Sequence, residues 1–382
     1  MLYWDNAATT WPKPTMVCHA AGQAMRRFGA NPGRAGHRMS LETAEMVYAC
    51  RQTVADFFGL ADPSGVIFTP NCTTALNMVI QSLAGKDGRV LTSDLEHNAV
   101  VRPLTALSVY PRYDTAAWSP DKEEIIENFR RAIGVNTKLI LCTHASNVFG
   151  SVFPIHEIGK LAHDHGVPFC VDAAQTAGVL PIDMEENHID YLCVAPHKGL
   201  YAPMGTGLLL CRDKNAILPL IRGGTGSYSM LAWQPEELPD RLESGTLNVV
   251  GIHGIQAGLR FVQQRGRTEI YRHEIQCLQA LYKRLESCEG IRLYTAYPQL
   301  AETAPVLSVN VSDRPSEEIA TLLDRRGIAV RAGLHCAPWA HRRFGTIEQG
   351  TIRLAPSAFS SIAEAEYIAK VFSEIAEKSL RR

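Results

Sequence analysis

Short apolar runs alternate with amphipathic helical patterns from about Leu41 to Cys211, and this alternation constrains the fold more than any other feature of the chain. The expected strands cover residues 65–70, 89–94, 138–146, 168–174, 189–195 and 205–211. The expected helices cover residues 40–60 and 154–166, and further helices begin near 73 and 98. Nearly continuous apolar strands separated by helices are typical of a largely parallel sheet with helices on both faces. The sequence therefore predicts an α/β domain that binds its ligand at the carboxyl ends of the strands.

The pattern changes after about Val250, where long helices precede short strands. We expect helices at 251–266, at 269–288 and from Ser361, and strands at 304–312, 327–333 and 351–356. These elements indicate a smaller α+β domain at 251–382, beside a large domain at 15–250. The arm 1–14 is too short to fold alone, so we expect it to pack on the small domain.

Composition limits the function classes. The chain has 382 residues, of which 46% are hydrophobic, and this composition is typical of a soluble globular protein. Its formal net charge of -1 offers no electrostatic attraction to nucleic acid or membranes. No apolar run approaches the roughly 20 residues that span a bilayer, and the beginning of the chain has no signal-peptide pattern. We therefore expect a cytoplasmic protein.

The ten cysteines are scattered singly, without a CxxC pair or metal-ligand spacing, so no metal site is predicted. Several of them, Cys142, Cys170, Cys193 and Cys211, lie in apolar runs, where cysteine behaves as a small hydrophobe. Cys336 is different, because it lies in the polar, turn-rich stretch "RAGLHCAPWAH". This cysteine requires another explanation.

One lysine, Lys198, lies between two apolar runs in "YLCVAPHKGLYAPMGTGLLLC". Burial lowers the pKa of a lysine, and a neutral amine attacks aldehydes to form a Schiff base. The ordinary alternative is a lysine at a strand end that extends to solvent. Neighbouring motifs decide between the two.

Three further motifs each carry a weak signal. In "FCVDAAQTAG", Asp172 ends an apolar run and Gln175 follows, and a carboxylate there can keep a pyridine nitrogen protonated. In "TPNCTTALN", free N–H groups at a helix start would join the hydroxyls of Thr73 and Thr74 in an anion site. In "SDLEHNAV", His97 occupies another strand-to-helix junction. Taken singly, these residues could be helix caps, turn formers or a surface histidine.

Ten segments, in this order, resemble the fold-type I pyridoxal-phosphate enzymes of aminotransferase class V, and specifically the cysteine desulfurase/selenocysteine lyase family. They are "YWDNAATTWPKP", "NPGRAGHRMS", "TPNCTTALN", "DLEHNA", "THASNVFG", "VDAAQTAG", "APHKG", "ESGTLN", "RAGLHCA" and "TIRLAPS". The resemblance covers nearly the whole chain. It implies pyridoxal 5'-phosphate as cofactor, a mostly parallel seven-stranded sheet in the large domain, a smaller α+β C-terminal domain, and a homodimer with active sites at the subunit interface.

The same resemblance implies cofactor-binding roles. Lys198 forms the Schiff base with the cofactor and later moves the Cα proton. Asp172 pairs with the pyridine nitrogen, Gln175 bonds to the phenolic oxygen, and His97 stacks on the ring. The phosphate is held by residues of both subunits, namely Thr73, Thr74 and His197 of one chain and Thr246 of the other.

Substrate-binding roles follow in the same way. Asn147 and Arg353 bind the substrate carboxylate, for which a guanidinium has bidentate geometry. Arg34 and His37 resemble family positions near the substrate. Cys336 takes the sulfur of L-cysteine as a persulfide, and L-alanine is released. Because a free thiol is only about 3% ionised at pH 7, a base or cation must lie nearby.

The chain departs from the family pattern at Ala195, where many members have a hydroxyl residue that reaches the phosphate. One phosphate contact is therefore expected to be missing, unless Thr225 or Ser227 replaces it. The segment after Cys336 is compact, as in members that transfer sulfur slowly unless an acceptor protein is present. The sequence does not identify that acceptor.

Several alternatives stay open. A class V aminotransferase or epimerase would share the cofactor residues without needing a thiol, and a selenocysteine lyase would act on L-selenocysteine. Cys336 could instead be a free cysteine in a mobile loop, or join His335 and His341 at a metal, although no fourth ligand is evident. Finally, a non-catalytic sulfur-relay scaffold could keep the fold, because fold alone does not assign activity.

Overall fold

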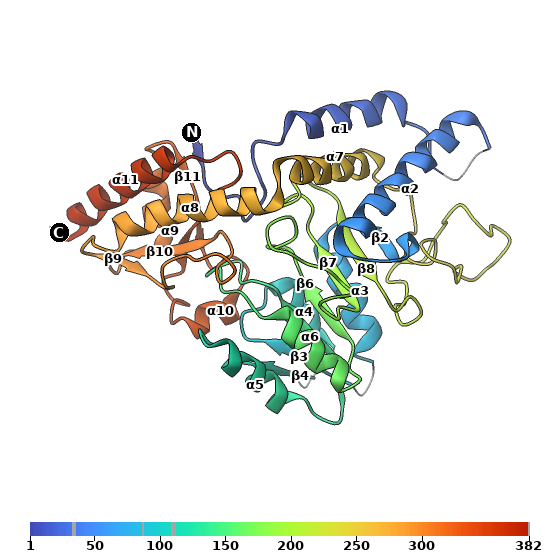
Figure 1. Ribbon diagram of the computed structural model, residues 1–382, viewed down its shortest axis with the longest axis horizontal. Helices are drawn as coiled ribbons and strands as arrows, with labels where there is room; N and C mark the ends of the chain where they lie inside the picture. The colour runs from blue at the N-terminus through green and yellow to red at the C-terminus, as the bar shows by residue number, and fades with distance from the viewer. Residues whose placement is uncertain (33–35, 86–87, 108–111, 381–382) are drawn as a thin grey trace.

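The computed structural model of the protein describes residues 1–382 except 33–35, 86–87, 108–111 and 381–382. Its centre is a seven-stranded sheet in the order β2-β8-β7-β6-β5-β3-β4 (Figure 1). Only β8 pairs antiparallel to its neighbours, so the predicted mostly parallel sheet is confirmed. The strands are β2 (Val66–Thr69), β3 (Arg89–Ser93), β4 (Tyr113–Ala116), β5 (Thr137–Thr143), β6 (Phe169–Asp172), β7 (Tyr191–Val194) and β8 (Gly207–Cys211).

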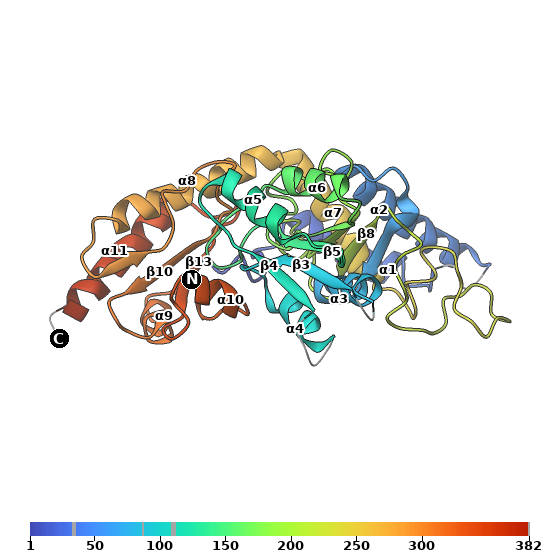
Figure 2. The ribbon, with the colours of Figure 1, turned by 90° about the horizontal axis from the view of Figure 1, so that it is seen from below.

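Both faces of this sheet are covered by helices (Figure 2). One face packs on α2 (Arg38–Phe58), α5 (Lys122–Ala132), α6 (Ile155–Asp164) and α7 (Val249–Arg265). The other face packs on α3 (Cys72–Leu83) and α4 (Asn98–Ala106). Because successive strand side chains point to opposite faces, Ile140 and Cys142 enter the first layer while Leu139 and Leu141 enter the second. Two apolar layers explain why the strands read as unbroken apolar runs.

The small domain is built on the antiparallel sheet β12-β13-β10-β9, and the predicted α+β character is confirmed. Its helices α8 and α11 lie side by side at one end of the molecule (Figure 1). Its elements are α8 (Arg267–Leu285), β9 (Ile291–Leu293), β10 (Leu307–Val311), α9 (Ser316–Asp324), β11 (Ile328–Ala329), β12 (Arg331–Gly333), α10 (Pro338–Arg343), β13 (Thr351–Leu354) and α11 (Ile362–Leu380).

The N-terminal arm packs on this domain, as expected. Its strand β1 (Leu2–Tyr3) pairs in parallel with β11, and Trp4 is fully buried in the core of the small domain. A short bridge between Asp5 and Ala355 carries the arm past the end of β13. Beyond this bridge the arm continues toward the large domain.

Helix α7 leads us to propose a different domain boundary from the predicted residue 250. It packs along α1 (Thr15–Arg27) and α2, and its apolar residues Ile252, Ile255 and Leu259 belong to the core of the large domain. Gly266, with a φ of +83°, separates α7 from α8. We therefore propose that the small domain begins at about this glycine.

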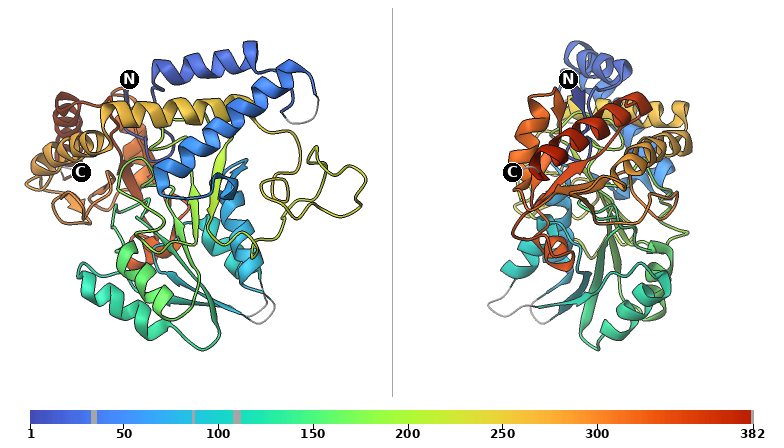
Figure 3. Two further views of the ribbon diagram at one scale, coloured as in Figure 1. Left: turned by 45° about the vertical axis from the view of Figure 1, so that its right-hand side comes forward. Right: turned by 90° about the vertical axis from the view of Figure 1, so that its left-hand side faces the viewer.

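Several elements were not predicted from the sequence. They are α1, β4, α5, β9, α9, α10 and a single 3-10 turn, η1 (Pro63–Gly65). Residues 212–248 contain no helix or strand. Ile217 and Leu242 pack in the core of the large domain, and the loops between them extend away from the body of the molecule (Figure 3). Within the described parts of the chain, no helix is both long and apolar enough to cross a membrane.

Candidate active site

A pocket of about 120 Å³ lies at the carboxyl ends of the parallel strands, where the sequence placed a ligand site. Polar residues reach it from the ends of β5 and β6, from the starts of α3 and α4, and from the loop after β7. Because the carboxyl ends of parallel strands share one edge, residues far apart in the chain meet there. The pocket brings together these predicted residues: Thr73, His97, Asn147, Asp172, Gln175, His197 and Lys198.

Lys198 lies in a tightly hydrogen-bonded turn after β7. Its N–H donates to the Ala195 carbonyl at 3.1 Å, and its own carbonyl accepts from the Tyr201 N–H at 2.8 Å. The hydroxyl of Thr10, on the N-terminal arm, also donates to the Lys198 carbonyl at 3.1 Å. Burial lowers the pKa of Lys198, and the nearby Asp172 carboxylate opposes that change. The turn therefore presents an amine that loses its proton more readily than an exposed lysine.

Asp172 ends β6 and is buried, with 4% of its surface exposed. Its Oδ1 accepts the Ala174 N–H at 2.9 Å and the Cys72 thiol at 3.7 Å. Burial raises the pKa of Asp172, whereas the Ala174 N–H and the charge of Lys198 lower it. These contacts fix the carboxylate at the floor of the pocket, close to the amine.

His97 is the N-cap residue of α4. Its Nδ1 accepts the Ala99 N–H at 3.0 Å, so the neutral ring carries its proton on Nε2. Burial, followed by the charge of Lys198, lowers the pKa of His97 to about 4. The imidazole is therefore neutral at pH 7, with Nε2 as its hydrogen-bond donor.

The start of α3 forms one end of the pocket. Thr73 lines the pocket, but Thr74 does not, because its N–H and its hydroxyl both donate to Asn71 Oδ1, at 2.9 and 3.1 Å. Gly207, the first residue of β8, lies so close that an added Cβ would be 2.2 Å from the Asn71 carbonyl carbon. His197 contributes a buried Nδ1 that has no hydrogen-bond partner among the described residues.

The predicted departure at Ala195 is evident in the structure. Ala195 lines the pocket and is 4% exposed, so no hydroxyl occupies that position. Thr225 and Ser227 line a separate hollow beside Arg51, and the Ser227 hydroxyl bonds to Asp240. Within one chain, these two residues therefore do not replace the missing contact.

Cys336 does not line the pocket itself and lies in the loop between β12 and α10, which is bonded to residues in and next to the pocket. Its carbonyl accepts the N–H of Asn98, the residue after His97, at 2.7 Å. The side chain of Asn147 donates to the preceding carbonyl, that of His335, at 2.8 Å. Both loop residues have a positive φ, 48° at His335 and 57° at Cys336, which side chains other than glycine rarely adopt. Pocket residues thus hold the loop in a strained shape, with Cys336 exposed.

His335 does not serve as the base beside this thiol. Its Nε2 is bonded to the Thr351 carbonyl at 3.0 Å, and its ring stacks on His341 at 5.8 Å. Burial, followed by the charge of Arg353, lowers the pKa of His335 to about 2. The side chain is therefore neutral and directed into the small domain.

Arg353 lies behind the pocket, not on its surface. It belongs to β13 and is only 2% exposed. Nη2 donates to Asp5 Oδ1 at 2.8 Å and Nη1 donates to the Asn147 carbonyl at 3.1 Å. The guanidinium is thus held next to Asn147, and one of its three nitrogens, the buried Nε, has no partner among the described residues.

Two further predicted residues, His37 and Thr246, do not line the pocket within this chain. His37 is the exposed N-cap residue of α2, where its Nδ1 accepts the Ser40 N–H at 3.2 Å. Thr246 is exposed and does not line the pocket. Arg34 lies outside the described residues.

Sequence reasoning missed Asn71, Cys72 and Arg331. Asn71 and Cys72 line the pocket, and an asparagine before a helix start is a recognisable N-cap signal. The charge of Arg331 lowers the pKa of both His97 and Lys198, which places this cation near the pocket. No local pattern marks it, apart from its position in "RAGLHCA".

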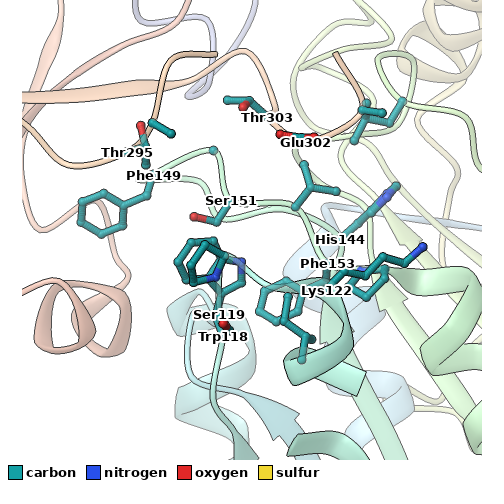
Figure 4. Close-up of a pocket in the computed structure, with 18 of the residues that line it drawn as sticks. Trp118, Ser119, Lys122, His144, Phe149, Ser151, Phe153, Thr295, Glu302 and Thr303 are labelled. Atoms are coloured by element: carbon teal, nitrogen blue, oxygen red, sulfur yellow. The ribbon is translucent and has the colours of Figure 1, made fainter. Parts of the chain in front are cut away.

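A larger cavity lies elsewhere and contains none of these residues. It has a volume of about 810 Å³, and its aromatic lining includes Trp118, Phe149 and Phe153 (Figure 4). The segment 144–153 connects the two sites, because it carries Asn147 in the small pocket and Phe149 in the large cavity. Chemistry, and not size, therefore identifies the candidate active site.

The fold and the lysine pocket together define a class of protein. The family described as aminotransferase class V matches residues 2–368, and the chain belongs to this family. Within the family it groups with the cysteine desulfurases. It is 30% identical over 98% of its length to a "Probable cysteine desulfurase" of Methanothermobacter thermautotrophicus, of which it covers 94%. A second relative, a "Probable cysteine desulfurase" of Pyrococcus abyssi, is 30% identical, with 100% of this chain and 95% of that protein aligned.

The solved structures agree. The apo structure of a cysteine desulfurase from Thermococcus onnurineus has a TM-score of 0.90 and 30% identity, and the match covers 99% of this chain and 95% of that one. A structure described as a NifS-like protein has a TM-score of 0.84 and 25% identity, over 98% and 99% of the two chains. The predicted family and fold class are confirmed.

Proposed function

We propose that the protein is a pyridoxal-phosphate-dependent cysteine desulfurase, which converts L-cysteine to L-alanine and transfers the sulfur to Cys336 as a persulfide. The observation that carries this proposal is the bond between the Cys336 carbonyl and the Asn98 N–H, which holds the exposed cysteine beside His97 and the Lys198 pocket. The names of the relatives support the same activity.

The pocket residues fit the cofactor. Lys198 supplies an amine for the aldehyde, and Asp172 supplies a buried carboxylate for the pyridine nitrogen. The unpartnered His197 Nδ1 and the start of α3 supply donors for the phosphate. When bound, pyridoxal phosphate supplies an electron sink that stabilises negative charge at the substrate Cα. The pairing of Gln175 with the phenolic oxygen stays a prediction, and its Nε2 here donates to the Ala7 carbonyl at 3.1 Å.

Substrate binding is assigned to Arg353 and Asn147. The unused Nε donor of a buried guanidinium gains an acceptor when a carboxylate arrives, and a charged pair of this kind is strongest away from water. Asn147 lies between that guanidinium and the pocket, because its carbonyl accepts from Arg353 while its side chain reaches the Cys336 loop. A role for Arg34 and His37 stays a prediction.

Proton transfer is assigned to Lys198 and His97. Burial lowers the pKa of Lys198, which favours the neutral amine that accepts the Cα proton. We assign the second proton transfer to the Nε2–H of neutral His97, because the residue after His97 is bonded to the Cys336 carbonyl. The substrate sulfur is then transferred: the Cys336 sulfur bonds to it as the Cβ–S bond breaks. A proton takes the place of the sulfur on Cβ, which gives L-alanine.

A homodimer completes this proposal. Residues 218–233 carry six exposed large apolar side chains, an unusual surface for a monomer: Leu218, Ile221, Tyr228, Met230, Leu231 and Trp233. We name them the 218–233 patch. Thr246 is exposed near the end of the same irregular segment. We propose that the patch packs on a second copy and that Thr246 there reaches the partner's phosphate site.

The decisive experiment compares alanine formation from L-cysteine and from L-selenocysteine by the wild type and by Cys336→Ala. We expect Cys336→Ala to lose at least 100-fold of the activity on cysteine and to retain activity on selenocysteine, because selenium leaves without a thiol acceptor more readily. Cys18→Ala, which removes another exposed thiol, is the matched control and keeps both activities. If Cys336→Ala still forms alanine from cysteine, Cys336 is not the sulfur acceptor and the proposal is wrong; if the wild type consumes cysteine without forming alanine, a class V aminotransferase or epimerase is favoured.

Two further measurements test the assignment of the cofactor and of the acceptor. Borohydride reduction of the cofactor-loaded protein adds the pyridoxyl mass to the peptide that contains Lys198, and its absence would exclude the Schiff base. Addition of a sulfur-acceptor protein raises the rate of alanine formation if the persulfide is normally passed on. The cytoplasmic location stays a prediction.

A further inference from the structure

The N-terminal arm contacts the candidate active site more extensively than its expected role in packing requires. Between Asp5 and Lys13 it reaches Arg353, Gln175 and the carbonyls of His197 and Lys198 through hydrogen bonds. The arm therefore connects the guanidinium of the small domain with the lysine turn of the large domain.

Asp5 makes the one charged contact between the arm and Arg353 that the described residues show. Its Oδ1 accepts from Arg353 Nη2 at 2.8 Å, and the two side chains are 21% and 2% exposed. The backbone on both sides of Asp5 is fixed, since the Trp4 carbonyl accepts the Ala355 N–H at 2.7 Å and the Asn6 side chain donates to the Ala355 carbonyl at 2.9 Å. The carboxylate therefore has a defined position.

The geometry of Arg353 shows what this contact does. Nη1 is held by the Asn147 carbonyl and Nη2 by Asp5, whereas Nε is buried without a partner. Two contacts at different nitrogens set the plane of the guanidinium and leave a free donor beside a pocket residue. A bidentate interaction with a carboxylate depends on that plane.

We propose that Asp5 is a positioning residue: it orients the Arg353 guanidinium so that its remaining donors bind the carboxylate of the amino-acid substrate. This inference rests on the proposed function only in requiring an α-amino acid as substrate. Asp5 acts through Arg353 and does not contact the substrate. The N-terminal arm is thus part of the substrate-recognition apparatus.

A purely structural role would have different consequences. If Asp5 only fastens the arm, its loss lowers stability and weakens all ligands equally. If Asp5 competes with the substrate for Arg353, its loss tightens the binding of every carboxylate. If Asp5 positions Arg353, the loss of Asp5 weakens the binding of ligands that carry a carboxylate and leaves the binding of other ligands unchanged.

The test compares two small amines that bind the cofactor-loaded protein, L-alanine with a carboxylate and cysteamine without one. Their affinities are measured from the change in cofactor absorbance, together with the melting temperature of each variant. We expect Asp5→Ala to bind L-alanine at least tenfold more weakly and cysteamine within twofold of the wild type. Asp5→Asn retains an oxygen acceptor without the charge, so we expect an intermediate loss of about threefold for L-alanine alone.

Glu364→Gln is the matched control, because Glu364 Oε2 accepts from the Trp4 indole at 3.3 Å and fastens the same arm without touching Arg353. It leaves the ratio of the two affinities unchanged. Equal weakening of both ligands, no weakening, or tighter L-alanine binding in the Asp5 variants would overturn the proposal. If Asp5→Ala does not fold, Asp5→Asn decides by the same ratio.

The proposed activity can fail separately from this inference. A wild type that forms no alanine from cysteine refutes the desulfurase proposal, while the ratio of L-alanine to cysteamine affinities still reports on Asp5. A wild type that binds L-alanine no better than cysteamine shows that Arg353 does not bind the carboxylate, and overturns the role of Asp5 directly.

Discussion

Replacing Gly207 by alanine should weaken cofactor binding through the backbone alone. The new Cβ would lie 2.2 Å from the Asn71 carbonyl carbon and 2.6 Å from the Cys72 nitrogen, and both are backbone atoms that no side-chain rotation can move. Ordinary contact begins at 3.4 Å, so the start of β8 and the start of α3 must separate by about 1.2 Å. The N–H groups that we assign to the phosphate lie at this helix start.

The size of the effect follows from this displacement. A hydrogen bond to a charged group contributes about 1.5–3 kcal/mol, so loss of one phosphate contact weakens pyridoxal-phosphate binding about 10- to 100-fold. Overpacking also lowers the free energy of unfolding by about 1–3 kcal/mol. The affinity is measured by titrating cofactor-free protein with pyridoxal phosphate and recording tryptophan fluorescence, and the stability is measured by urea unfolding of the same protein.

The same sheet edge provides a matched control. In Gly65→Ala the new Cβ would lie 2.3 Å from the Cys211 carbonyl, at the opposite end of β8, away from the pocket. We expect a similar loss of stability there with unchanged cofactor affinity. If Gly207→Ala binds pyridoxal phosphate as tightly as Gly65→Ala does, the start of α3 does not hold the phosphate and our reasoning about the site is wrong.

Three further predictions concern stability and assembly. Arg51→Met leaves the buried carboxylate of Glu243 unpaired and should lower the free energy of unfolding by about 3–5 kcal/mol in urea, and Glu243→Gln added to it should restore most of that loss. Burial lowers the pKa of His144 to about 3, whereas the unfolded value is near 6.5. Below pH 6.5 the unfolded state therefore binds more protons than the folded state, and the free energy of unfolding decreases as the pH is lowered, by up to about 1.4 kcal/mol per pH unit. His144→Gln should flatten this decline in unfolding experiments between pH 6.5 and 4. Trp233→Asp, in the 218–233 patch, should convert the proposed dimer to a monomer in sedimentation and weaken cofactor binding, because the proposed phosphate contact of Thr246 is then lost.

Local sequence patterns predicted most of the large domain. The strands were recognised because each is apolar on both faces, and their order along the chain implied a mostly parallel sheet. Asp172 and His97 were recognised because they follow such strands, and the carboxyl ends of parallel strands meet at one edge. Helix α1 was not predicted; it buries Val17, Ala20 and Ala24 and no larger apolar side chain.

Other features depend on contacts between segments that are far apart in the sequence. The proposed boundary at Gly266 follows from packing of α7 on α1 and α2, which no local composition change marks. Thr74 was predicted at the phosphate, but its donors are taken up by Asn71, a competition that spacing alone cannot resolve. Thr225 and Ser227 were candidates by composition, and the fold places them at a different hollow.

The sequence by itself determined the class of fold, because apolar runs and helical patterns are local properties, and its resemblance to a family supplied the expected roles of the site residues. Only the tertiary structure decided the partners of the reactive groups: Asp5 meets Arg353 and Asn147 meets the loop of Cys336 across long separations in the chain. A hydrogen bond depends on distance and direction in space, and these are set by the packing of whole helices and sheets. The orientation of the guanidinium and of the cysteine loop is therefore a property of the folded molecule.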